Sequence, residues 1–331
     1  MNADYIRTVQ LLLAVTPAIF DTPAFAMKGG TALNLFLQDM PRLSVDIDVV
    51  FVPHELPREE ALRAIADELA AAQARVDALG FSATLRKSKE GNEAKLFVSG
   101  AGVELKVEVN FVFRGTVLPP ERRALTPEAQ KMFSAHVEVP VLAVPELYGG
   151  KLVAALDRQH PRDLFDVQLM LARGGWSDDL LDCFVVYLAG HNRPAHEVLF
   201  PNEKPLEAVF ENEFVGMTSA PVGLDELIAT RQRLMHELPR ALQPRHRQFL
   251  LSMVSAEPQW HLLPHAHLAQ LPALQWKLHN LAKLKKNADK FRRQHDELAA
   301  RLEYGEQGSN PRFVVTNLKG KPEALCDGLY C

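Results

Sequence analysis

The sequence predicts an α+β protein in which a mixed β-sheet domain with flanking helices precedes an α-helical domain. Two observations support this class. Segments with the alternating pattern of strands lie in the first half, and stretches with helical spacing follow from residue 145 to about residue 301. Such a separation is typical of α+β chains. We place the boundary near Val144, which gives domains of residues 1–144 and 145–303 and a tail of residues 304–331.

The first domain is predicted to begin with a helix, a short strand and a second helix. Residues 9–20 have the apolar spacing of a packing helix, and residues 24–28 resemble a short strand. Gly29 and Gly30 interrupt that strand, and residues 31–38 return to helical spacing. The order indicates a unit of strand, glycine turn and helix.

Two further segments alternate between apolar and polar residues, as strands with one buried face do. They are residues 44–52 and 103–114, and the second is predicted to place Phe111 and Phe113 inside. A long helix is expected at 57–79. Residues 81–87 and 95–99 are expected to form strands around a turn at 89–92.

The composition describes a globular chain without a strongly basic surface. Of its 331 residues, 47% are hydrophobic and 24% are charged, and the net charge is −4. Any contact with nucleic acid therefore needs a local patch. Three cysteines are too few for a disulfide framework or a four-thiolate zinc site. The apolar run at 9–20 is shorter than a membrane helix. We expect a cytoplasmic protein with no membrane association.

The glycine pair is the first candidate ligand site. Glycines allow the backbone to approach a ligand, and a helix beginning near Thr31 would direct free N–H groups toward an anion such as phosphate. The Thr31 hydroxyl would add a donor. The alternative is an ordinary helix start with Thr31 as the N-cap, and for the glycine pair alone this alternative is favoured.

An acidic pair follows the glycines. Asp46 and Asp48 are two residues apart on a predicted strand, so their carboxylates point to the same side. A divalent cation such as Mg²⁺ would remove the repulsion between them. Glu108 would be a third carboxylate if the two alternating strands are neighbours. The alternative is that all three acids lie on a solvated strand face.

A lysine-bearing helix is the third candidate. Lys151 and Arg158 are seven residues apart, so a helix places them on one stripe that could clamp a polyphosphate. Arg162 and Asp163 begin the next predicted helix. Asp163 could simply offset the dipole of that helix.

These motifs together resemble the AbiEii/AbiGii family of nucleotidyltransferase toxins, within the DNA polymerase β-like nucleotidyltransferase superfamily. The resemblance covers residues 5–303 and rests on Gly-Gly-Thr, an Asp-x-Asp strand preceded by Arg42-x-Ser44, and a lysine helix followed by Arg-Asp-x-x-Asp. It implies an enzyme that transfers a nucleotide from an NTP to an RNA acceptor, in some relatives the 3′ end of tRNA. It also implies a cognate antitoxin encoded nearby.

The resemblance extends to particular residues. It implies that Asp46 and Asp48 bind Mg²⁺ or Mn²⁺, and that Asp163 is an essential late acid. Thr31 stands where serine is usual, and Glu108 stands where aspartate is frequent, so Glu108 could be a metal ligand or a base. With the residue patterns above, the candidates are Gly29, Gly30, Thr31, Lys151, Arg158 and Arg162 for the nucleotide, Asp46, Asp48 and Glu108 for the metal, and Asp46, Asp48, Lys151 and Asp163 for catalysis.

Two other functions use the same residues. A non-catalytic protein would hold a nucleotide or RNA without transferring anything. A phosphohydrolase would use the same carboxylates with water as the acceptor.

A basic tract near the end of the second domain is a candidate RNA contact. The alternative is a solvated helix face. The tract comprises Lys277, Lys283, Lys285, Lys286, Lys290, Arg292 and Arg293, with Trp276 and Phe291 interleaved.

Two remaining features have no predicted catalytic role. His261, His265 and His267 are expected to be loop or packing residues, because Pro264 interrupts the helix that a zinc site would need. The tail of residues 304–331 resembles a fragment of a DDE transposase, and we expect it to be poorly ordered.

Overall fold

The computed structural model describes residues 3–87 and 93–304. Within them, seven strands form one sheet in the order β3-β4-β5-β2-β1-β7-β6. The turn expected at 89–92 and the transposase-like segment lie outside the described residues. The strands are β1 (Phe25–Lys28), β2 (Ile47–Phe51), β3 (Ser82–Lys87), β4 (Glu93–Gly100), β5 (Val103–Asn110), β6 (Glu121–Ala124) and β7 (Glu138–Val141).

The sheet is mixed, which confirms the predicted α+β class. β2 lies between β1, to which it is antiparallel, and β5, to which it is parallel. In this register Asp48 pairs with Lys28 on one side and with Glu108 on the other. The two alternating strands are therefore neighbours, and the register places the acids that they carry in one part of the sheet.

Three details of the sheet differ from the prediction. β5 ends at Asn110, whose side-chain oxygen accepts the N–H groups of Val112 (2.8 Å) and Phe113 (3.0 Å). These bonds turn the chain out of the ladder, so Phe113 lies in a loop. β2 begins at Ile47, so Asp46 immediately precedes the strand. The edge strand β6 (Glu-Arg-Arg-Ala) was missed because it has no apolar alternation, and β7 and helix α4 (Pro127–Phe133) were missed with it.

Three helices support the sheet. α1 (Ala3–Ile19) and α3 (Arg58–Ala78) pack on each other and against the β3–β5 region. α2 (Gly29–Phe36) packs on β1 and β2 and also contacts α5. No helix among the described residues is long and apolar enough to cross a bilayer.

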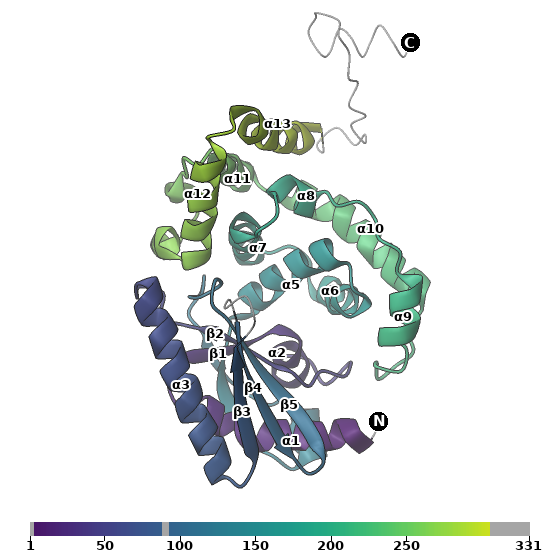
Figure 1. The fold of residues 1–331 in the computed structure, drawn as a ribbon. Helices are drawn as coiled ribbons and strands as arrows, with labels where there is room; N and C mark the ends of the chain where they lie inside the picture. The colour runs from purple at the N-terminus through teal and green to yellow at the C-terminus, as the bar shows by residue number, and fades with distance from the viewer. Residues whose placement is uncertain (1–2, 88–92, 305–331) are drawn as a thin grey trace, which may run out of the picture.

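The second half of the chain is helical, and α5 lies at its centre (Figure 1). α5 crosses α7 closely, because a Cβ at Gly149 would lie only 2.8 Å from the backbone nitrogen of Phe184. The helices are α5 (Val144–Arg158), α6 (Pro161–Arg173), α7 (Asp178–Gly190), α8 (Ala195–Leu199), α9 (Glu207–Glu213), α10 (Leu224–Ala241), α11 (Pro244–Val254), α12 (Pro272–Leu284) and α13 (Ala288–Tyr304), with short 3₁₀ turns at Trp260–Leu262 and Ala266–Gln270.

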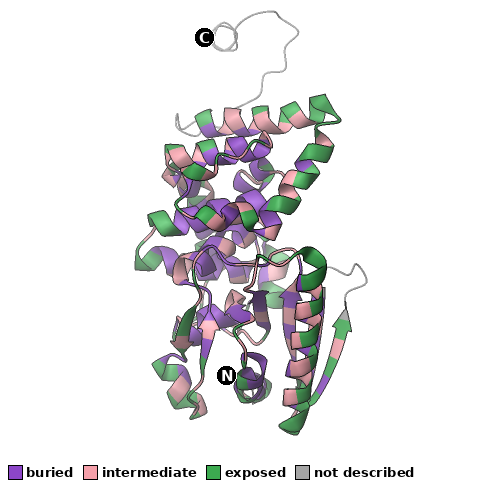
Figure 2. Ribbon diagram, turned by 90° about the vertical axis from the view of Figure 1, so that its left-hand side faces the viewer, coloured by how far each residue is buried: buried purple, intermediate pink, exposed green. Residues whose placement is uncertain are grey.

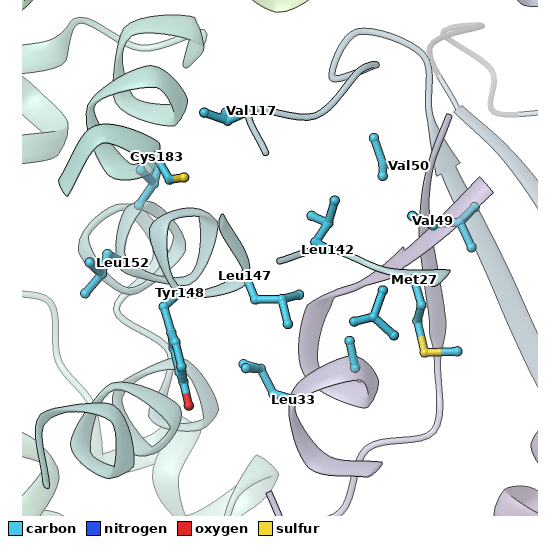
Figure 3. Close-up of a cluster of buried hydrophobic side chains, with 14 of the residues drawn as sticks. Met27, Leu33, Val49, Val50, Val117, Leu142, Leu147, Tyr148, Leu152 and Cys183 are labelled. Atoms are coloured by element: carbon cyan, nitrogen blue, oxygen red, sulfur yellow. The ribbon is translucent and has the colours of Figure 1, made fainter. Parts of the chain in front are cut away.

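One apolar core joins the sheet to α5. In Figure 3, Leu147 of α5 lies beside Leu33 of α2 and Leu142, with Met27 and Val49 of the sheet farther on, and all are buried. Buried residues continue from the sheet into the helices, whereas exposed residues lie on the outer turns of the peripheral helices (Figure 2). Because α2 packs both on α5 and on β1 and β2, apolar burial also fixes Lys151 relative to Asp48.

Candidate active site

A cavity of about 530 Å³ lies between the centre of the sheet and helices α5 and α6. Its wall brings together every candidate residue of the sequence analysis except Thr31. Those residues are Gly29, Gly30, Asp46, Asp48, Glu108, Lys151, Arg158, Arg162 and Asp163. The wall also contains residues that the sequence motifs did not single out as site residues: Lys28, Arg42, Ser44, Lys106, Phe113, Glu146, Tyr187 and His191.

The two glycines bring the backbone of α2 directly against charged side chains. Gly29 has φ = +77°, and a Cβ at this position would overlap the Asp48 carboxylate. A Cβ at Gly30 would lie 2.7 Å from Nη2 of Arg42 and 2.8 Å from Oγ of Ser44. Side chains from β2 and the loop before it therefore occupy the space that any larger residue would need.

Thr31 lies behind the wall of the cavity. It is 1% exposed, and its hydroxyl is 3.1 Å from the hydroxyl of Ser44. The expectation that α2 starts near Thr31 was wrong: the helix begins at Gly29 and its N-cap residue is Lys28. In this arrangement Thr31 supports Ser44, which lines the cavity.

Asp48 is the more enclosed of the two aspartates. Its pKa is raised above that of an ordinary aspartate because burial disfavours the charged form and because Glu108 and Asp46 add negative charge, while Lys28 and Lys151 act in the opposite direction. Asp46 is exposed at the start of the strand. Burial is therefore the main reason that the charged form of Asp48 is disfavoured, and Lys28 and Lys151 do not fully offset it.

Glu108 faces two lysines. Its carboxylate is 2.7 Å from Nζ of Lys95 and 3.0 Å from Nζ of Lys106. Burial acts to raise the pKa of Glu108, but these lysines outweigh it and lower that pKa. Among the described residues no three His, Cys, Asp or Glu side chains are placed to hold a metal ion. Lysines occupy the carboxylate of Glu108, and its role as a third metal ligand beside Asp46 and Asp48 stays a prediction.

Lys151 projects from α5 into a network of buried charges. Its Nζ lies 2.9 Å from a carboxylate oxygen of Asp163 and 2.9 Å from one of Asp166. Burial acts to lower the pKa of Lys151, but the two aspartates outweigh it and raise that pKa. Arg158 contacts Asp163 at 2.8 Å, and its own side chain is 64% exposed. Lys151 is therefore a fixed cation, and Arg158 reaches from the network into the cavity.

Asp163 is fully engaged by these cations. Burial acts to raise its pKa, but Lys151 and Arg158 outweigh it and hold that pKa below its usual range. α6 starts beside it with His160 as the N-cap, whose ring nitrogen accepts the N–H of Arg162 at 3.1 Å. The geometry makes Asp163 a permanent anion that orients two cations.

The partner of this network on the sheet side is Arg42. Its guanidinium donates two hydrogen bonds of 2.7 Å to the carboxylate of Asp166, and both side chains are buried. This ion pair joins residues 124 positions apart and links the loop before β2 to α6. The sequence motif included Arg42 and Asp166, but nothing in the sequence indicated that they pair.

The far wall of the cavity is aromatic and contains a buried acid. Glu146 accepts the N–H groups of Val117 (2.9 Å) and Leu118 (3.0 Å) and the hydroxyl of Tyr187 (3.1 Å). Burial raises the pKa of Glu146 to about 7. The ring of Phe113 stacks on Tyr187 at 5.9 Å between centroids. No motif identified this wall, because its residues come from separate parts of the chain.

Of the three histidines, His267 packs against the sheet domain, whereas His261 is exposed. His267 lies 2.9 Å from the carbonyl oxygen of Thr116, and its ring is 5.2 Å from that of His54. These contacts join the turn before α12 to the loops that follow β5 and β2.

Comparison with known proteins identifies the family. Residues 10–280 match the family model described as "Nucleotidyl transferase AbiEii toxin, Type IV TA system". The fold is similar to that of MenT4, a nucleotidyltransferase toxin from Mycobacterium tuberculosis H37Rv, with a TM-score of 0.55 and 18% sequence identity. That match covers 83% of this chain and 95% of MenT4. The resemblance found in the sequence is confirmed: the chain is a nucleotidyltransferase and belongs to the AbiEii toxin family of type IV toxin–antitoxin systems.

Proposed function

We propose that the chain transfers a nucleotide from an NTP to a hydroxyl of an RNA acceptor, such as the 3′ end of tRNA, with Mg²⁺ or Mn²⁺ held by Asp46 and Asp48. The family implies a nucleotide substrate and an antitoxin partner, and we expect that partner to be encoded beside this gene. The observation that supports the proposal is that both aspartates line the same cavity as the glycine pair and the lysine helix.

The two aspartates suit a divalent ion. Mg²⁺ sites commonly use one or two protein carboxylates and complete their coordination with substrate phosphates and water. Asp48 has a raised pKa because of its burial and its acidic neighbours, so a bound cation would relieve an existing repulsion. When bound, the ion would neutralise charge on the attacking and leaving oxygens.

The cations of the cavity suit a triphosphate. Gly29 and Gly30 begin α2, where free N–H groups favour an anion, and a Cβ at either position would collide with the wall. Arg158 and Arg162 line the side toward α6, and Lys151 is held charged between two aspartates. These residues would bind and orient the phosphates, which is the protein's main contribution in phosphoryl transfer.

In the proposed step, the acceptor oxygen forms a bond to the α-phosphorus while the bond to the bridging oxygen of the β-phosphate breaks, and pyrophosphate leaves. We assign the hydroxyl proton to water, because Lys95 and Lys106 make Glu108 a weak proton acceptor. Asp163 is proposed as a positioning residue that holds Lys151 and Arg158.

The test is a labelling assay with the full chain. The protein is incubated with each α-labelled NTP, total RNA and either Mg²⁺, Mn²⁺ or a chelator, and labelled RNA is measured. Label should enter RNA only when metal is present. Asp46→Asn should lower the initial labelling rate by a factor of about 100 or more. Asp67→Asn, at an exposed position on α3, is the matched control.

Equal labelling by the parent and Asp46→Asn would refute the assignment. Release of phosphate or pyrophosphate without labelled RNA would indicate a phosphohydrolase instead. Binding of NTP without either product would indicate a non-catalytic binding protein.

A further inference from the structure

The basic tract predicted from the sequence separates into one partly buried lysine and an exposed group. Lys277 is held by the backbone: its Nζ donates to the carbonyl oxygens of His191 (2.7 Å) and Arg193 (2.8 Å), beyond the end of α7. Burial lowers the pKa of Lys277 to about 8. Its role is to fix α12 against α7.

The remaining cations gather where α12 ends and α13 begins. Residues 283–293 contain six Lys or Arg and one acid in a chain whose net charge is −4. We call the exposed residues Lys283, Lys286, Lys290 and Arg293 the basic tip. The segment lies just beyond residues 10–280, which match the family model.

The four side chains of the basic tip make no ion pair with any other described residue. Their neighbours are partly neutralised, because Lys285 lies 3.5 Å from Glu257 and Arg292 lies 3.1 Å from Asp289. An ordinary solvated helix face mixes charges of both signs at the spacing of one turn. Arg293 has Asp289 and Glu297 one turn to either side, but those acids pair with Arg292 and His196. The four side chains of the basic tip therefore keep unpaired positive charge among the described residues, which favours binding of a polyanion.

An exposed aromatic pair lies on the same helix as part of the tip. Trp276 is 50% exposed and stacks on His279 at 5.6 Å between centroids. Lys283 is seven residues beyond Trp276 on α12, so the two lie on one stripe of the helix. Cations beside an exposed aromatic surface are the combination that binds single-stranded RNA, because the backbone is neutralised while bases stack.

α12 connects this surface with the catalytic cavity. Its first turn contributes Ala273 and Leu274 to a small recess that is also lined by Phe113, Glu146 and Tyr187 of the cavity wall. α12 has 13 residues, so at 1.5 Å per residue its far end lies roughly 20 Å from that wall. An RNA of modest size can contact both places.

We propose that the basic tip, with Trp276, is a docking surface for the sugar-phosphate backbone of the acceptor RNA. This inference rests on the proposed RNA acceptor and assigns a binding surface to it. The surface acts in binding and has no part in the chemical step.

The test measures binding of labelled bulk tRNA to the full chain without NTP, at several salt concentrations, so that no transfer takes place. Lys286→Glu with Arg293→Glu should weaken binding by roughly tenfold or more at 0.1 M salt and should reduce the slope of log K against log salt by about 1.5, as the loss of two phosphate contacts requires. The matched control is Arg63→Glu with Lys131→Glu, which changes the net charge equally at exposed positions on α3 and α4. The control should bind tRNA like the parent.

Two further measurements complete the test. Stabilisation of the folded chain by NTP with Mg²⁺ should be the same in both double variants, which would show that the catalytic cavity is intact. Duplex DNA should compete less well than tRNA at equal phosphate concentration. Three outcomes would each overturn the docking surface: equal tRNA binding by the two double variants, no tRNA binding by the parent, or better competition by DNA than by tRNA. The labelling assay above decides the transfer activity independently of these results.

Discussion

Replacement of Gly29 by alanine should separate backbone strain from damage to the proposed metal site. Gly29 has φ = +77°, and Gly102 in the turn between β4 and β5 has φ = +76°. An alanine in this region costs about 1 kcal/mol of stability. The surroundings differ, because a Cβ at Gly102 meets nothing within 4 Å, whereas a Cβ at Gly29 lies 3.1 Å from both Cβ and Cγ of Asp48 and overlaps the carboxylate.

The carboxylate of Asp48 must therefore move by roughly 1 Å in Gly29→Ala, a displacement that can cost on the order of 100-fold in rate. Urea unfolding should show losses of about 1 kcal/mol in both Gly29→Ala and Gly102→Ala. Initial labelling rates over a range of Mg²⁺ concentrations should fall about 100-fold, with a higher metal requirement, in Gly29→Ala alone. Equal rates in the two variants would refute the argument that Gly29 exists to make room for Asp48.

Two predictions concern pH. Asp182→Asn should lose about 3 kcal/mol at pH 7, since it weakens the hydrogen bonds that this buried carboxylate accepts from His246 (2.8 Å) and Arg245. Burial acts to raise the pKa of Asp182, but these hydrogen bonds outweigh it and lower that pKa. The stabilisation is therefore present above the ordinary aspartate pKa and is lost as pH falls through the lower folded value. Urea unfolding at pH 7 and pH 3 should show the difference between parent and variant shrinking in acid, and a constant difference would contradict it. Glu146→Gln concerns a pH dependence of the opposite sign. Burial raises the pKa of Glu146 to about 7, so the parent loses stability as pH rises from about 4.5 through 7. The Gln variant should lack this decrease in stability. Melting temperatures measured from pH 5 to pH 8 check this, and parallel curves for the two proteins would rule it out.

The arrangement of acids shows where sequence patterns were sufficient and where they failed. The alternation around Asp46 and Asp48 placed both acids on one side of the chain, and the cavity contains both. Glu108 was expected beside them only if the two strands were neighbours, which they are, but its lysine partners were not predicted. Lys95 pairs with Glu108 across the β4–β5 ladder, and Lys106 precedes it by two residues on the same face. The ladder register brings Lys95 to Glu108, and local alternation does not specify it.

The basic tract shows the same limit for helices. Composition identified the concentration of cations, but Lys277 and Lys286 look alike in the sequence. Where α12 packs on α7, Nζ of Lys277 donates to three backbone carbonyl oxygens. Lys286, just beyond the end of the same helix, stays exposed. Whether a lysine fixes a helix or contacts a ligand depends on which neighbour covers it.

The sequence by itself determined the fold class, the family and nine of the residues that line the cavity, because each of these depends on short-range spacing along one strand or one helix. The tertiary structure decided which of those residues are free to meet a ligand. In the folded chain Thr31 is buried behind Ser44, and Glu108 forms ion pairs with two lysines. Arg42 pairs with Asp166, which lies 124 positions away in the sequence. Burial and charge pairing depend on contacts between distant parts of the chain, and these contacts exist only after the core has packed.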